Sequence, residues 1–126
     1  MGEGKKVLVC DDSILARMQL SEAIKKCCPD VTIEQAADGI QAIGKYTEFH
    51  PDLTFLDIVM PKKDGIEAAR SILSGDEKAN IVIVSSVGTQ NKVREAIEIG
   101  VRDFIQKPFA QDQVTEVLRY YLGEES

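Results

Sequence analysis

Apolar runs and amphipathic stretches alternate five times along this chain of 126 residues. The apolar runs, several of them bounded by Gly, Pro or Asp, predict five strands, at about 6–10, 31–36, 53–56, 80–84 and 102–106. Apolar residues at helical spacing between and after these runs predict five helices, at about 13–27, 39–49, 65–73, 90–99 and 112–122. Strand and helix therefore follow one another through the whole chain.

The first, third and fourth apolar runs are nearly continuous rather than alternating with polar residues. Continuous runs are typical of strands that are covered on both faces, as in a parallel sheet between two layers of helices. Every connection contains a helix long enough for a right-handed crossover. We therefore predict an α/β, doubly wound, five-stranded parallel sheet with five helices, in a single domain over 1–126 with a core at about 5–122.

Polar and charged side chains follow four of the predicted strands. Asp11 and Asp12 come after the first strand, Asp57 after the third, Ser85 after the fourth and Lys107 after the fifth. In open α/β folds, ligands collect beyond the carboxyl ends of the strands. The sequence therefore predicts one site that brings together three carboxylates, a hydroxyl and an ammonium.

Three carboxylates at one point repel each other. Two like charges about 4 Å apart cost roughly 4 kcal/mol at an effective dielectric constant near 20. Lys107 offsets one charge, and a divalent cation would offset more; hard oxygen ligands favour Mg²⁺, for which Mn²⁺ could substitute. The alternative, that Asp11 and Asp12 only cap the first helix, leaves Asp57 and Lys107 unexplained. An aspartate beside a cation and a lysine can attack phosphorus and form an acyl phosphate.

Composition excludes some other kinds of partner. The formal net charge is −6 and no basic stripe is visible, which argues against direct binding of nucleic acid. No apolar stretch approaches the roughly 20 residues needed to span a bilayer, and the N-terminus lacks the apolar core of a signal peptide. The spacing of Cys10, Cys27 and Cys28 does not suggest zinc, so we expect reduced thiols in the cytoplasm.

The constellation of Asp11-Asp12, Asp57, Ser85 and Lys107-Pro108 resembles the receiver domain of bacterial and archaeal response regulators. The run 57–61 followed by Asp64-Gly65 also matches that family. The resemblance covers about the whole chain and implies the strand order 2-1-3-4-5. Because the chain ends just after the fifth predicted helix, it is similar to stand-alone receivers of the chemotaxis type (CheY-like).

The resemblance implies a phosphoacceptor of a two-component system, not an enzyme acting on other substrates. Asp57 would take phosphate from a phosphohistidine of a sensor histidine kinase. Asp12, Asp57 and the backbone carbonyl of Val59 would hold Mg²⁺, with Asp11 acting mainly through water. Lys107 and Ser85 would contact the phosphoryl group.

The family also implies a switch and surfaces for partners. Ser85 would move toward the phosphoryl group, Phe104 would turn inward from solvent, and the peptide bond before Pro108 would be cis. Val59 and Val87 flank the expected path of attacking water, which predicts slow self-dephosphorylation and a possible separate phosphatase. An output protein, such as a flagellar motor switch component, would read the switched surface. The expected kinase docking residues are Ile14, Leu15, Met18 and Phe109.

Three alternatives are less consistent with the residues. In an FMN carrier of the flavodoxin type, Asp11 and Asp12 would repel the phosphate. A Mg²⁺-dependent aspartyl phosphatase needs an acid two residues after the nucleophile, where this chain has Val59. An interaction module independent of phosphorylation would not need the full set of acidic residues and lysine.

Overall fold

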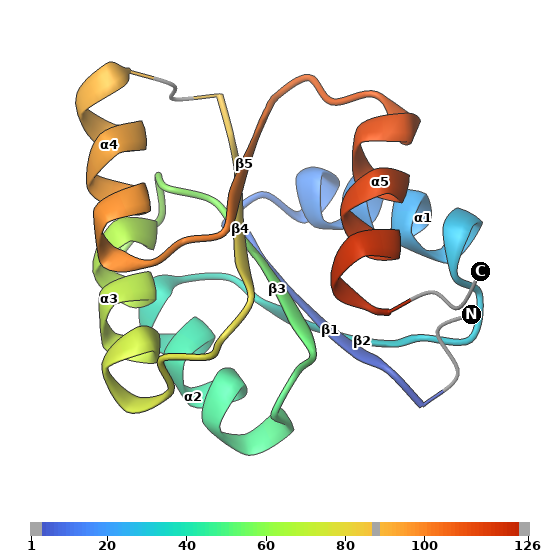
Figure 1. The fold of residues 1–126 in the computed structure, drawn as a ribbon, viewed down its shortest axis with the longest axis horizontal. Helices are drawn as coiled ribbons and strands as arrows, with labels where there is room; N and C mark the ends of the chain where they lie inside the picture. Colours follow the sequence, from blue (N-terminus) through green and yellow to red (C-terminus); the bar gives the residue numbers. More distant parts are fainter. Residues whose placement is uncertain (1–3, 87–88, 124–126) are drawn as a thin grey trace.

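The computed structural model describes residues 4–86 and 89–123. The strands are β1 (Lys6–Cys10), β2 (Thr32–Ala36), β3 (Leu53–Leu56), β4 (Ile81–Ser85) and β5 (Asp103–Gln106). The helices are α1 (Ile14–Cys27), α2 (Gly39–Phe49), α3 (Gly65–Gly75), α4 (Gln90–Ile99) and α5 (Gln111–Tyr121). All strand pairs are parallel, in the order β2-β1-β3-β4-β5 (Figure 1). The predicted fold class and strand order are confirmed.

The sheet lies between two layers of helices, with α1 and α5 on one face and α2, α3 and α4 on the other (Figure 1). Side chains of β1 alternate between the two layers, because successive residues of a strand point to opposite faces. Val7 and Val9 join the core beneath α1 and α5, whereas Leu8 and Cys10 join the core beneath the other three helices. All four are buried. The continuous apolar run was therefore a correct indication of a strand covered on both sides.

Side chains that accept hydrogen bonds mark the starts of the first four helices. Ser13 accepts a bond from the N–H of Ala16, and the same geometry recurs at Asp38, Asp64 and Thr89. Each such cap stabilises a helix by about 1 kcal/mol. Predicted element boundaries differ from the observed ones by one or two residues, as is usual at frayed ends.

The loop between β3 and α3 is tightly held. Gly65 donates its N–H to the carbonyl of Ile58 at 2.7 Å, and a Cβ on Gly65 would overlap the carbonyl of Asp57. Lys62 takes a left-handed conformation with φ of 71°, and its Nζ lies 3.7 Å from Oδ2 of the buried Asp38. This packing fixes the chain that leaves β3, and with it the position of Asp57.

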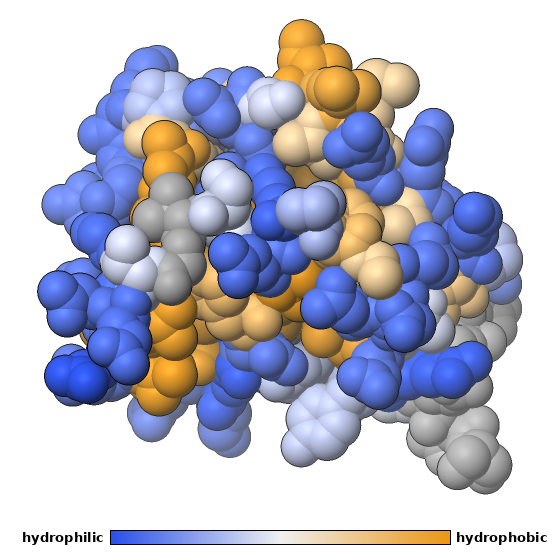
Figure 2. Space-filling model, turned by 90° about the horizontal axis from the view of Figure 1, so that it is seen from above, coloured by the Kyte–Doolittle hydropathy of each residue, from blue (hydrophilic) through white to orange (hydrophobic). Residues whose placement is uncertain are grey.

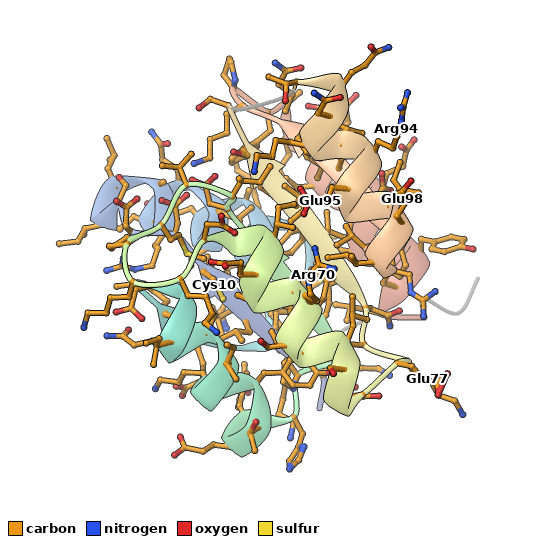
Figure 3. All side chains as sticks on the ribbon, turned by 90° about the vertical axis from the view of Figure 1, so that its left-hand side faces the viewer. Cys10, Arg70, Glu77, Arg94, Glu95 and Glu98 are labelled. Carbon is orange, nitrogen blue, oxygen red and sulfur yellow. The ribbon has the colours of Figure 1, made fainter. Side chains whose placement is uncertain are left out.

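The layer formed by α2, α3 and α4 has polar links at its surface. Figure 3 shows Arg70 of α3 facing Glu95 of α4, where the two side chains form an ion pair at 2.9 Å. This pair is largely exposed and contributes at most about 1 kcal/mol. The phenol of Tyr46 donates to Oδ2 of Asp76 at 2.8 Å, which ties α2 to the end of α3. Among the described residues, no helix has the length and apolar character to span a bilayer.

Candidate functional site

The predicted site residues lie at the carboxyl ends of the strands, at or next to the last residues of β1, β3, β4 and β5. Backbone hydrogen bonds extend the sheet by one residue beyond β3 and β5. The N–H of Asp57 donates to the carbonyl of Cys10, and the N–H of Lys107 donates to the carbonyl of Ser85, each at 3.0 Å. The backbones of Asp57 and Lys107 are therefore fixed by the sheet itself rather than by a flexible loop.

The three carboxylates come together as predicted. One ligand oxygen from each of Asp11, Asp12 and Asp57 lies within 4.8 Å of the others. Asp11 and Asp57 are only 6% and 8% exposed, whereas Asp12 is exposed. A cation placed among them would contact two carboxylates shielded from solvent and one at the surface.

Lys107 reaches both buried carboxylates. Its Nζ lies 2.6 Å from Oδ2 of Asp11 and 3.2 Å from Oδ2 of Asp57. A single ammonium therefore bridges two carboxylates from different strands. With Asp12 included, three negative charges face one positive charge, which leaves an excess of two negative charges at one point.

The second oxygen of each buried carboxylate is held by the backbone. Oδ1 of Asp11 accepts a hydrogen bond from the N–H of Ser13 at 2.9 Å. Oδ1 of Asp57 accepts one from the N–H of Ile58 at 2.7 Å. Each carboxylate thus has one oxygen directed to the backbone and the other to Lys107, and its orientation is set before any ligand arrives.

The surroundings shift two pKa values in this site. Burial raises the pKa of the Asp11 carboxyl, and the charge of Asp57 adds to this, while hydrogen bonds from Lys107 and the Ser13 N–H oppose it without cancelling it. Burial lowers the pKa of Lys107, but Asp11 and Asp57 outweigh that effect and raise it overall. Lys107 therefore remains an ammonium at neutral pH, whereas the pKa of Asp11 lies above its usual value mainly because the carboxyl is buried.

Arg17 is a supporting residue that the sequence analysis missed. Its Nη1 donates to the backbone carbonyl of Asp11 at 2.6 Å, and its Nε donates to the side chain of Gln35 at 2.9 Å. The guanidinium thus joins α1 to the end of β1 and to β2. The sequence places Arg17 one turn after the Ser13 cap, which was a signal for its role. Only the folded chain shows which backbone carbonyl accepts a hydrogen bond from its guanidinium.

The burial of the two predicted switch residues, Ser85 and Phe104, can be compared with what was expected. Ser85 is fully buried at the end of β4. Phe104 was expected to begin in solvent; instead it is half-buried and packs against the core beneath α2, α3 and α4. The correction follows from its register beside Ile83 of β4, which turns its side chain toward that core. The bond between Lys107 and Pro108 is cis, as the resemblance implied.

The predicted docking residues on α1 form an exposed hydrophobic cluster. Ile14, Leu15 and Met18 are 68%, 62% and 52% exposed. Figure 2 looks onto the end of the sheet that carries the carboxylates, and hydrophobic residues stand out at its upper edge, over the start of α1. The cluster is therefore on the same face as the site.

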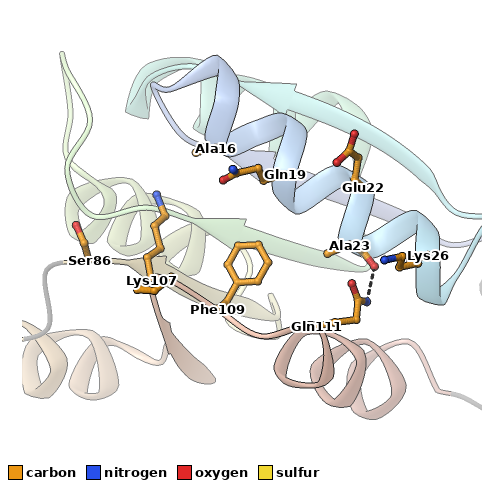
Figure 4. Close-up of a pocket in the computed structure, with 10 residues that line it drawn as sticks. Ala16, Gln19, Glu22, Ala23, Lys26, Ser86, Lys107, Phe109 and Gln111 are labelled. Atoms are coloured by element: carbon orange, nitrogen blue, oxygen red, sulfur yellow. Dashed lines mark hydrogen bonds between the residues drawn. The ribbon is translucent and has the colours of Figure 1, made fainter.

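A groove of about 860 Å³ lies between α1 and the segment after β5 (Figure 4). Lys107, Pro108 and Phe109 line one side of it, and residues of α1 line the other. At one end of the groove, Gln111 donates to the carbonyl of Ala23 at 2.9 Å (Figure 4). Phe109, the fourth predicted docking residue, is half-buried in this groove rather than part of the exposed cluster. Groove and site share Lys107.

Comparison with protein families gives a match to the model of the response regulator receiver domain over residues 7–119. The chain belongs to the response regulator receiver family. It is 43% identical over 115 residues to the chemotaxis protein CheY of Thermotoga maritima, covering 91% of this chain and 95% of the relative. It is 41% identical over 118 residues to CheY of Bacillus subtilis, covering 94% and 98%.

Other relatives extend the same picture. Sporulation initiation phosphotransferase F of Bacillus subtilis is 32% identical over 118 residues, covering 94% of each chain. Among solved structures, the complex of CheX and CheY with beryllofluoride and Mg²⁺ from Borrelia burgdorferi matches with a TM-score of 0.87 and 30% identity, covering 95% of this chain and 90% of that one. This receiver is thus a phosphoacceptor signalling protein of the two-component and chemotaxis type. Receivers of this family bind Mg²⁺ at an acidic pocket, and the aspartate cluster has the corresponding place here.

We predict that the ion pair of Lys107 and Asp11 is energetically coupled well beyond an ordinary surface pair. A double-mutant cycle with Lys107→Met and Asp11→Asn, in buffer free of divalent cations, should give a coupling energy of about 2 kcal/mol, because Lys107→Met leaves the buried charge of Asp11 without its partner. The exposed pair Lys45–Glu34, at 2.9 Å, is the matched control and should give about 0.5 kcal/mol. Urea unfolding measures both cycles, and equal coupling energies would contradict the buried-bridge account.

Proposed function

We propose that Asp57 is the residue that carries the phosphoryl group, received from a phosphohistidine of a sensor kinase. The observation that supports this most is the bridge of Lys107 between Asp57 and Asp11. It places a fixed positive charge beside one oxygen of a buried carboxylate whose other oxygen is held by the backbone. A nucleophile held in this way loses little freedom on reaction, which is the main contribution of a protein to phosphoryl transfer.

The donor set fits Mg²⁺, or Mn²⁺ in its place. Asp12 and Asp57 would be direct ligands, together with the backbone carbonyl of Val59, and Asp11 would act mainly through water. Carboxylates are hard oxygen donors, and Mg²⁺ commonly uses one or two of them while keeping several waters. The excess of two negative charges at the cluster supports a divalent cation rather than a monovalent one. When bound, the ion neutralises charge on the carboxylates and on the transferring phosphoryl group.

In the transfer, the unprotonated oxygen of Asp57 forms a bond to phosphorus as the bond from phosphorus to the histidine nitrogen breaks. Nζ of Lys107, now 3.2 Å from Oδ2 of Asp57, would follow a phosphoryl oxygen as negative charge moves outward. Ser85 would donate its hydroxyl to another phosphoryl oxygen. The ion pair of Lys107 with Asp11 keeps the ammonium near the site during this change of partner.

The same movement provides the switch. As Ser85 turns toward the phosphoryl group, Phe104 would complete its burial in the space that Ser85 vacates. Because Phe104 is already half-buried, the gain is less than the 1.5–3 kcal/mol expected for full burial of such a side chain. A gain of about 1 kcal/mol shifts a two-state equilibrium roughly fivefold. A partner that binds one of the two states more tightly would add to this shift.

For the kinase, we propose docking over the cluster of Ile14, Leu15 and Met18 and the groove beside Phe109. The exposed hydrophobic surface lies next to the site, so that a helical partner seated there would deliver its phosphohistidine to Asp57. The same proposal includes two further partners: an output protein, such as a flagellar motor switch component, and a separate phosphatase. We propose the cytoplasm as the location of the protein. The CheY solved together with CheX supports a second protein acting on a receiver of this kind.

Mass measurement after incubation with acetyl phosphate and Mg²⁺ tests the central proposal. The parent should gain one phosphoryl group, and the gain should vanish in Asp57→Asn and when the divalent cation is chelated. Asp64→Asn is the matched control, because it removes a carboxylate that caps α3 and is not one of the three in the cluster, and it should still be modified. A phosphorylated Asp57→Asn protein would contradict the proposal.

We also propose that the phosphoryl group is lost slowly, because Val59, at 57% exposure, presents an apolar side chain two residues after Asp57. Val87, the other residue expected to border the water path, lies outside the described residues. Replacing Val59 by Asn supplies a group that can orient water and should shorten the phosphoryl half-life about tenfold, which is less than the roughly 10²–10⁴-fold effect of a positioned general acid or base. Val59→Leu is the control of similar polarity; a half-life unchanged by Val59→Asn would refute the role of Val59.

A further inference from the structure

The adjacent thiols of Cys27 and Cys28 stand out at the end of α1, away from the phosphoacceptor site. The Sγ atoms lie 3.3 Å apart, although side chains of neighbouring residues usually diverge. Cys27 is the last residue of the helix and is half-buried, whereas Cys28 is fully buried in the core beneath α1 and α5. The pair therefore has one sulfur at the surface and one directly behind it.

The backbone holds this arrangement in place. The N–H of Cys28 donates to the carbonyl of Ile24 at 2.8 Å, and the N–H of Val31 donates to the carbonyl of Cys28 at 3.3 Å. Lys25 reaches past the helix end and donates its ammonium to the carbonyls of Pro29 and Val31, at 3.2 and 2.5 Å. The turn is thus tied at several points, and little freedom is lost when both sulfurs bind one atom.

A disulfide is a poor product of this pair. Cα atoms of adjacent residues are about 3.8 Å apart across a trans peptide bond. Disulfides in proteins usually need Cα atoms about 4.4–6.8 Å apart, and departures from that range store strain and make the bond easy to reduce. Oxidation would therefore have to distort the turn that Lys25 and Val31 hold.

A single bridging atom fits better, and the spacing indicates which kind. Two bonds of about 2.3 Å, the usual length to sulfur, span the 3.3 Å between the Sγ atoms at an angle of about 92°. Tetrahedral zinc would need the sulfurs about 3.8 Å apart for bonds of that length. Zinc would also need further ligands. Among residues 4–86 and 89–123, the group of three or more candidate metal ligands is the aspartate cluster, which does not include these cysteines. Arsenic(III), with a lone pair, forms pyramidal centres with angles near a right angle.

We propose that Cys27 and Cys28 form a bidentate site for trivalent arsenicals that carry one organic group. With the hydrated form of such an arsenical, which carries two hydroxyl groups on arsenic, two As–S bonds form and two As–O bonds break; the two thiol protons leave with the two hydroxyl groups as two waters, and no oxidant is involved. Entry is from the half-buried side of Cys27. The site is independent of the phosphoacceptor, since the 14 residues of α1 separate it from Ser13 by about 20 Å.

The test uses phenylarsine oxide as the probe on the reduced, folded protein, followed by intact mass and removal with increasing concentrations of a monothiol. The parent should take up one phenylarsenic group. In the parent, two linked thiols hold the arsenic, whereas in Cys27→Ser only one sulfur does. The monothiol concentration needed to remove the phenylarsenic group should therefore be at least about 100 times higher for the parent. Cys28→Ala should behave like Cys27→Ser. Because Cys28 is in the core, the fold of the Cys28→Ala variant is checked by circular dichroism. If that variant does not fold, the comparison of the parent with Cys27→Ser decides the test alone.

Two controls separate this site from the rest of the molecule. Cys10→Ala should leave the adduct unchanged, because Cys10 is buried in the core on the opposite face of the sheet from Cys28. Asp57→Asn should bind the arsenical like the parent, so failure of the phosphoacceptor proposal would leave this one standing. The proposal is overturned if the adduct of the parent is removed as easily as that of Cys27→Ser, or if the parent reacts only after unfolding.

Discussion

Repulsion among three carboxylates is the constraint around which this end of the sheet is organised. Asp11, Asp12 and Asp57 place ligand oxygens within 4.8 Å of one another, two of them on buried residues. Lys107 compensates only part of that charge. A fold does not keep such a cluster for stability, because replacing a buried charged group by an apolar one is often neutral or favourable. The cost is understandable if the cluster exists to hold a cation and a phosphoryl group.

The scaffold imposes this crowding by fixing the backbone on each side of it. The sheet ladder continues to Asp57 and Lys107, and the hydrogen bond from the N–H of Gly65 to the carbonyl of Ile58 holds the loop close to the end of β3. Arg17 holds the carbonyl of Asp11 in the same way from α1. Because the backbone is held as well as the side chains, adding or removing charge at the cluster is expected to move side chains, such as those of Ser85 and Phe104, before it moves the strands.

The fold and the main site residues could be predicted because they depend on strong, local signals. Continuous apolar runs indicated buried parallel strands, and the carboxyl ends of such strands meet at one edge, which brought Asp57 and Lys107 together in the prediction. Features that depend on side-chain direction or on distant packing were harder. The half-buried position of Phe104 follows from its register beside Ile83, and the contact of Arg17 with Asp11 requires the folded helix. The 3.3 Å approach of Cys27 and Cys28 depends on the turn after α1, which a pattern of residues does not specify.

The most direct test of the account is calorimetric titration of Mg²⁺ into the parent and into Asp12→Asn, with Asp30→Asn as a control for an exposed acidic residue elsewhere. The account predicts one Mg²⁺ per chain, affinity reduced at least about tenfold in Asp12→Asn, and no change in Asp30→Asn. It also predicts that Asp12→Asn is more stable than the parent when no divalent cation is present, because one repelling charge is gone. Unchanged Mg²⁺ affinity in Asp12→Asn, with no gain in stability, would contradict the central claim.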